Sequence, residues 1–125
     1  MPPVTRFEDL VAWQEARRLH QAVVALCRRA EFKNEYRLVG QMLAAGRSVG
    51  ANIAEGFERF TPGEFSYKLY IAKGEVGELR SFLYAAHDEG RIPEAEFKAL
   101  VAQTESVSRL VGALRASVAK RKPHD

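Results

Sequence analysis

Residues 47–56 read RSVGANIAEG, a stretch inside a segment that otherwise has the pattern of an amphipathic helix. Small side chains allow another backbone to come close, and polar side chains at such a contact must find partners. Arg47, Asn52 and Glu55 are unusual choices for a helix that only fills a core. We therefore expect this helix to be the central and most enclosed element of the fold.

Two helices are predicted in the first half of the chain. Around the quoted stretch, a helix is expected over residues 35–58 with Asn34 as its N-cap. Upstream, Thr5 followed by Glu8 forms a capping-box pattern that predicts a helix over residues 7–31. Their apolar stripes are Leu10, Trp13, Ala16, Leu19/His20, Val23, Leu26/Cys27 and Ala30 in the first helix, and Leu38, Met42, Ala45, Val49, Asn52, Ile53 and Gly56 in the second.

Two more helices are predicted downstream. Thr61 and Pro62 form a helix start, Gly90 ends that helix, and Pro93 opens the fourth. The stripes keep an almost unbroken alternation of four and three residues, which is typical of a coiled-coil-like seam. They are Phe65, Leu69, Ala72, Val76, Leu79, Leu83 and Ala86, then Phe97, Leu100, Thr104, Val107, Val111, Leu114 and Val118. Gly74 and Gly77 suggest close approach by another helix.

Four helices joined by short links predict an all-α fold, an antiparallel up-down-up-down four-helix bundle. We expect an N-terminal extension over residues 1–6, the bundle over residues 7–119 and a basic C-terminal tail over residues 120–125. No apolar run approaches the roughly 20 residues that span a bilayer, and the start lacks the apolar core of a signal peptide. The single cysteine, Cys27, excludes an internal disulfide, so a cytoplasmic location is the default.

The formal net charge is +3, which raises the possibility of a polyanionic partner. Without Lys120, Arg121 and Lys122, the chain has 16 basic and 16 acidic residues. The candidate contacts to RNA or DNA are the cationic pairs of the first helix and this tail: Arg17, Arg18, Arg28, Arg29, Lys120, Arg121 and Lys122. The alternative is that these side chains are merely solvated, as charged surface residues usually are.

Motifs for catalysis are absent from the sequence. Di-metal bundles use Glu-x-x-His pairs, and none of the three histidines has a glutamate three positions before it. His20 and Cys27 share a helix face but are about 10 Å apart along the helix axis, too far for a direct hydrogen bond. We therefore expect no enzymatic activity and no cofactor.

A polar set in the second and third helices is more informative. Arg47, Asn52 and Glu55 lie on one helix, and Glu75 and Glu78 are one turn apart on the next. Clustered carboxylates could hold a cation, or the set could contact a partner. A structural network is favoured, because carboxylates without partners are costly in a core.

Aromatic residues outside the seam indicate a second contact surface. Tyr67, Tyr70, Phe82 and Tyr84 do not all fit the stripe of the third helix. A bundle helix with two apolar faces usually has a second partner, here expected to be another copy of the chain.

The sequence resembles the 23S rRNA intervening sequence protein family of bacterial four-helix bundles. The resemblance rests on Phe7-Glu8-Asp9-Leu10 with Trp13-Gln14, on Gln41 and Arg47-Ser48, on Asn52-Ile53-Ala54-Glu55-Gly56, and on Phe65, Leu69, Ile71-Ala72, Gly74 and Glu78-Leu79. The family usually has Ser where this chain has Glu75. The resemblance adds Gln41 to the polar set.

The resemblance implies a bundle that assembles as a ring, commonly a homopentamer, with no established catalytic activity. The accessory protein of diversity-generating retroelements is similar, and it works with nucleic acid. We therefore expect a non-enzymatic homo-oligomer that contacts RNA or DNA, with no membrane association and no small-molecule substrate. The alternative is a protein-interaction scaffold without nucleic-acid binding.

Overall fold

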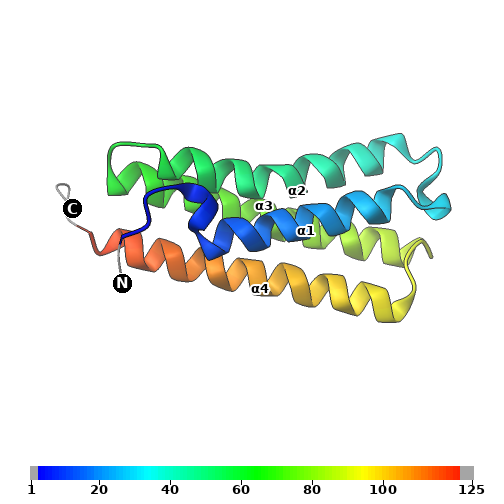
Figure 1. Ribbon diagram of the computed structural model, residues 1–125. Coiled ribbons are helices and arrows are strands. Elements are labelled where there is room, and N and C mark those ends of the chain that lie inside the picture. Colours follow the sequence, from blue (N-terminus) through cyan, green and yellow to red (C-terminus); the bar gives the residue numbers. More distant parts are fainter. Residues whose placement is uncertain (1–2, 122–125) are drawn as a thin grey trace.

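The computed structural model describes residues 3–121 as an antiparallel bundle of four α-helices (Figure 1). The helices are α1 (Val11–Cys27), α2 (Tyr36–Phe57), α3 (Pro62–Asp88) and α4 (Glu94–Ala119), with short 3-10 helices η1 (Phe7–Asp9) and η2 (Ala30–Phe32). Each α-helix packs against its two neighbours in the cycle α1–α2–α3–α4–α1. The predicted up-down-up-down bundle is therefore confirmed.

Most residues of the predicted stripes lie in the core, but in the first two stripes Ala30 is exposed and Trp13, His20, Cys27, Leu38 and Asn52 are only half-buried. Ala12, Phe32 and Ile92, which the stripes did not include, also belong to the core. All seven stripe positions of α3 are buried, and so are those of α4 except Leu114, which is partly buried. Thr104 is fully buried within this apolar seam, and its hydroxyl donates a hydrogen bond to the carbonyl of Val101 at 2.6 Å. A hydroxyl that bonds back to its own helix avoids the cost of an unpaired buried polar group.

The first helix begins later than predicted because the Thr5–Glu8 capping box does not form. Residues Phe7–Asp9 make a single 3-10 turn, and Leu10 is extended with φ −74° and ψ 125°. This break turns the chain so that Phe7 packs edge-on against Trp13, with 5.1 Å between ring centroids. An edge-to-face aromatic pair of this geometry is favourable and helps to hold the turn in place.

The connection between α1 and α2 also differs from the prediction. The first helix ends at Cys27, and Asn34 is no N-cap but has φ +68°, a left-handed conformation that asparagine tolerates. Arg91 joins this connection to the one between α3 and α4. Its guanidinium donates to the Glu31 carbonyl and to the Glu35 carboxylate, both at 2.7 Å. These long-range bonds replace the local cap that the sequence suggested.

The predicted start of the third helix is correct. Thr61 is the N-cap, and its hydroxyl oxygen accepts a hydrogen bond from the Glu64 amide at 3.1 Å, with Pro62 at the first helical position. The expectation that α2 is the central helix is wrong, because all four helices surround one common core and none is central. The predicted basic tail lies outside the described residues from Lys122 onward.

Candidate functional site

The six residues of the predicted polar network lie at or near the surface of the bundle, and none is fully buried. Gln41, Arg47, Glu55 and Glu78 are exposed, whereas Asn52 and Glu75 are half-buried. Asn52 donates to the carbonyl of Ser48 on its own helix at 2.9 Å. Because Asn52 uses its side chain within α2, it does not link α2 to α3, and the six residues do not form one enclosed network.

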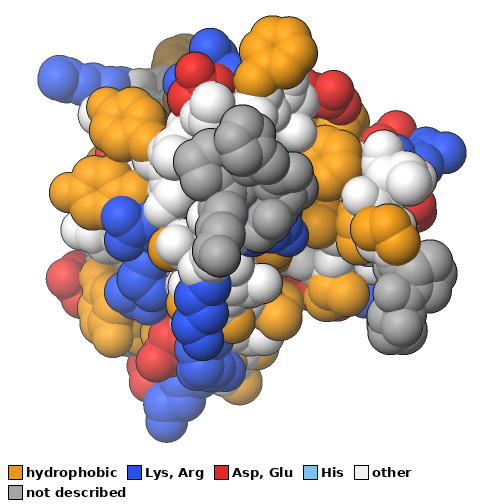
Figure 2. Space-filling view, turned by 90° about the vertical axis from the view of Figure 1, so that its left-hand side faces the viewer, with side chains coloured by type: hydrophobic (Ala, Val, Ile, Leu, Met, Phe, Trp, Pro, Cys, Tyr) orange, Lys and Arg blue, Asp and Glu red, His pale blue; other side chains and the backbone are white. Residues whose placement is uncertain are grey.

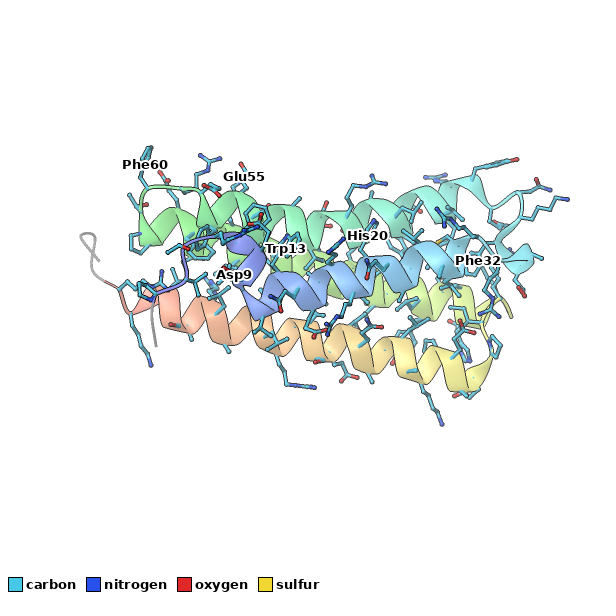
Figure 3. All side chains as sticks on the ribbon, viewed as in Figure 1. Asp9, Trp13, His20, Phe32, Glu55 and Phe60 are labelled. Atoms are coloured by element: carbon cyan, nitrogen blue, oxygen red, sulfur yellow. The ribbon has the colours of Figure 1, made fainter. Side chains whose placement is uncertain are left out.

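Glu55 makes the one cross-helix ion pair of this set within residues 3–121. Its carboxylate lies 3.3 Å from the Lys68 ammonium of α3 and also accepts a hydrogen bond from Arg59. The hydrogen bond from Arg59 is the largest cause that lowers the pKa of Glu55, and the nearby Lys68 ammonium lowers it further. Figure 3 shows Glu55 on α2, near the α2–α3 connection. Exposed ion pairs of this kind contribute little to stability, because water and salt screen them.

Glu75 and Glu78 have a different environment. Burial raises the pKa of Glu75, and the neighbouring charge of Glu78 raises it further. Neither carboxylate has a cationic partner in the part of the chain that the structure describes. The two side chains therefore form an acidic pair that the monomer leaves uncompensated.

A cationic surface lies where the first part of α3 packs against the last part of α4. Residues 65–74 and 106–121 contain no Asp or Glu, and together they carry six Lys and Arg. Since the whole chain has a net charge of +3, the rest of it is net negative. We call this surface the α3/α4 basic face; its residues are Tyr67, Tyr70, Lys73, Arg109, Arg115, Lys120 and Arg121. Figure 2 shows Lys and Arg side chains gathered beside hydrophobic ones on one side of this end of the bundle.

Contacts between α3 and α4 fix this face. The Lys73 ammonium donates to the Ser108 hydroxyl at 3.0 Å, and Arg115 donates to the Ser66 carbonyl at 3.2 Å. The Arg115 guanidinium also lies 5.1 Å from the ring centroid of Tyr70, within cation–π range. These cations use neutral partners, so their charges remain available to an anion.

Two tyrosines lie beside these cations with their rings largely in solvent. Tyr67 and Tyr70 are stacked with 6.5 Å between ring centroids, and their side chains are 60% and 59% exposed. Phe82 instead packs partly buried against the core, and Tyr84 packs edge-on against Phe97. The four aromatics predicted to form one face therefore do not act together.

The cationic residues singled out in the sequence do not share a surface. Arg28 and Arg29 follow the C-terminal end of α1, whereas Lys120 and Arg121 follow α4 at the opposite end of the bundle (Figure 1). Arg29 pairs with Glu96 and Glu31, and Arg18 pairs with Glu15 at 2.8 Å. Their contact with nucleic acid stays a prediction, with Lys122 outside the described residues. Lys73, Arg109 and Arg115 were not among the predicted contacts, because the near-neutral charge of the chain without its tail hides a local excess of cations on α3 and α4.

The chemistry available at other positions is limited. Burial raises the pKa of the Cys27 thiol, which disfavours the reactive thiolate. Among residues 3–121, no three His, Cys, Asp or Glu side chains are grouped so that they could hold a metal ion. Within the same range, no helix has the length and apolar character needed to cross a membrane.

Comparisons with known proteins agree with this fold. The family model for the 23S rRNA-intervening sequence protein matches residues 8–113. The chain belongs to this family. A solved structure of a protein of unknown function from the S23 ribosomal protein family of Bacteroides thetaiotaomicron superimposes with a TM-score of 0.76 at 22% identity, covering 85% of this chain and 96% of that chain. No curated protein matches the chain.

Proposed function

We propose that this family member is a non-enzymatic cytoplasmic protein that self-associates and binds RNA or DNA through the α3/α4 basic face. The observation that supports nucleic-acid binding is the acid-free junction of α3 and α4, where cations and exposed tyrosines lie together. Cationic side chains attract phosphates and release counterions, and tyrosine rings stack on unpaired bases. A single-stranded segment is therefore the ligand that this surface fits best.

Self-association is the second part of the proposal. Tyr36 and Tyr84 keep much of their surface exposed outside the core. Large apolar side chains outside the seam favour a further protein contact. A homopentamer is the size that the family resemblance implies.

Binding is tested by fluorescence anisotropy with labelled oligouridine and oligothymidine. About four phosphate contacts would weaken binding roughly 50-fold between about 50 and 200 mM salt. The test variant replaces Arg109, Lys120 and Arg121 with Glu, because these side chains are exposed and have no acidic partner within residues 3–121. We expect this variant to lose most of its affinity and most of its salt dependence.

A matched control carries the same change in charge at other exposed positions. Lys33→Glu, Arg37→Glu and Lys98→Glu alter side chains outside the α3/α4 basic face. The control should bind more tightly than the test variant by at least tenfold. Equal losses in both variants would mean that binding depends on net charge alone, and wild-type protein that does not bind would favour the protein scaffold.

Base stacking has its own test. Tyr67→Leu keeps an apolar side chain but removes the aromatic ring. Stacking on one base is worth about 1–3 kcal/mol, so we expect a loss of about tenfold for unpaired strands and little change for duplexes. A variant that binds both ligands like the wild type would restrict the interaction to phosphates.

A further inference from the structure

A groove of ≈ 200 Å³ runs between α1 and α2. Its floor consists of small residues, and two rings of α1 lie across it. Trp13 rests against Gly50, and His20 rests against Gly46, where an added Cβ would meet the ring atoms at 3.4 and 3.2 Å. Figure 3 shows Trp13 and His20 on the side of α1 that faces α2. The groove is lined by Trp13, Ala16, Arg17, His20, Gly46, Arg47, Gly50 and Ala51.

Two arginines from different helices line this groove, and no carboxylate does. Arg17 lies with its guanidinium 6.0 Å from the Trp13 ring centroid, and Arg47 is close enough to lower the pKa of His20, which burial lowers more strongly. Neither arginine has an acidic partner within residues 3–121. Like charges on both sides of an apolar groove favour an anionic occupant.

The position of this groove along the bundle can be read from helix contacts. Gly46 of α2 faces both His20 of α1 and Leu79 of α3. The ion pair between Glu55 and Lys68 shows the same alignment of α2 with α3 further along these two helices. Arg47 directly follows Gly46, and Arg17 is one turn before His20, so in these antiparallel helix pairs both arginines lie at the level of residues 75–78 of α3. The acidic pair, Glu75 and Glu78, therefore stands at the same height as the two arginines but on α3, outside the groove.

We propose that the α1/α2 groove receives the Glu75 and Glu78 side chains of a second copy of this chain. The inference rests on the proposed self-association and names the surfaces that carry it. The unpartnered arginines of one copy and the unpartnered carboxylates of the next complement each other in charge. Because two different surfaces meet, the contact is heterologous and every copy offers both halves.

The shared height determines how two copies would lie. Two parallel copies joined at the same level need no shift along the bundle axis, so the contact places α3 of one copy beside α1 and α2 of the next.

Charge reversal tests this contact by sedimentation velocity in the absence of nucleic acid. We expect Arg17→Glu with Arg47→Glu, and separately Glu75→Lys with Glu78→Lys, to reduce the oligomer to a species near the monomer mass of 14.0 kDa. The variant that combines all four reversals should recover the oligomer, because each copy then carries both complementary surfaces with exchanged signs. Helical circular dichroism establishes that each variant is folded. Should Glu75→Lys with Glu78→Lys not fold, Glu75→Gln with Glu78→Gln replaces it, and Arg17→Gln with Arg47→Gln likewise replaces the arginine reversal.

A control reverses two arginines that lie away from the groove, Arg28→Glu with Arg37→Glu, and should keep the oligomer. A wild-type monomer would overturn both this inference and the proposed self-association. A wild-type oligomer that persists in both double variants would overturn this inference alone. Double variants that dissociate without recovery in the combined variant would show that the two surfaces do not pair with each other.

Discussion

Three glycines of α2 and the two glycines in the middle of α3 have different surroundings in the fold. A Cβ added at Gly46, Gly50 or Gly56 would meet side chains of α1 or α3 within 4 Å. At Gly74 and Gly77 of α3, an added Cβ would meet nothing within that distance. The chain's own packing therefore requires small residues at these three positions of α2, whereas an added Cβ at Gly40 of α2 would meet nothing within 4 Å, as at Gly74 and Gly77 of α3.

This difference shows what small residues in a helix do and do not establish. The prediction of close approach is correct for α2, where rings from the neighbouring helices occupy the space. It is wrong within this chain for α3, where no neighbouring helix comes near Gly74 or Gly77. A glycine that is not needed for packing makes the helix about 1 kcal/mol less stable than alanine would, and no contact inside the monomer compensates for this cost.

The largest effect is expected at Gly56. A methyl group there would lie 2.8 Å from the Lys68 Cβ and 2.8 Å from the Phe65 ring, and 3.3 Å from the Phe65 carbonyl oxygen. Because a Cβ and a backbone carbonyl cannot move without moving α3, Gly56→Ala should lower the free energy of unfolding by about 2 kcal/mol. Urea unfolding measures this change. An unchanged midpoint would mean that the α2–α3 contact is looser than the structure shows.

A smaller loss is expected at Gly46. The added methyl group would lie 3.2 Å from Nδ1 of His20, a buried atom with no hydrogen-bond partner among residues 3–121. Moving the ring should make Gly46→Ala about 1 kcal/mol less stable than the wild type. In a His20→Ala background the same substitution should instead become stabilising, because the ring is gone and only the gain in helix propensity remains. A cost that persists in that background would mean that the His20 ring is not what opposes the methyl group.

The sequence determined the core better than it determined the helix ends. Every stripe residue of α3, from Phe65 to Ala86, is buried as predicted, because the seam depends only on spacing within one helix. The Thr5–Glu8 pattern failed because the Phe7–Trp13 contact competes with it. Asn34 failed as a cap because Arg91, far away in the sequence, holds that connection.

The candidate sites depend on register between helices, which spacing within one helix does not give. The acid-free segments 65–74 and 106–121 are visible in the sequence, but only the α3–α4 contacts bring them together. The groove arginines belong to α1 and α2 and meet only through the packing of Gly46 and Gly50. The charges along each predicted helix therefore indicate the α3/α4 basic face, but they do not indicate the α1/α2 groove.

A gain in stability is expected when Gly74 is replaced by Ala. This substitution tests whether the glycines of α3, unlike Gly46, Gly50 and Gly56 of α2, are free of contacts. Gly74 is exposed, and an added methyl group has open space around it. Gly74→Ala should raise the free energy of unfolding by about 0.7 kcal/mol through helix propensity alone. Urea unfolding at a concentration where sedimentation shows a single species measures it. A loss of stability would indicate that a contact outside the chain needs the glycine.

The smallest expected effect is a pH dependence of stability that arises from His20, whose ring packs against Gly46. Burial, and then Arg47, lower the pKa of His20 in the folded protein. As the pH falls from about 7 to about 5, the unfolded chain takes up a proton near its ordinary pKa of about 6.5, while the folded chain resists protonation. The contribution of His20 to stability is therefore present above that value and is lost as the pH falls toward the lowered pKa.

His20→Gln removes this titration, so its melting temperature should fall less than that of the wild type over the same pH range. The comparison is made within each protein, which cancels the cost of the substitution itself. Equal falls in both proteins would mean that His20 is protonated in the folded state as easily as in the unfolded chain. That result would also contradict the enclosed position of the ring between α1 and α2, on which the contrast between the glycines of α2 and α3 depends.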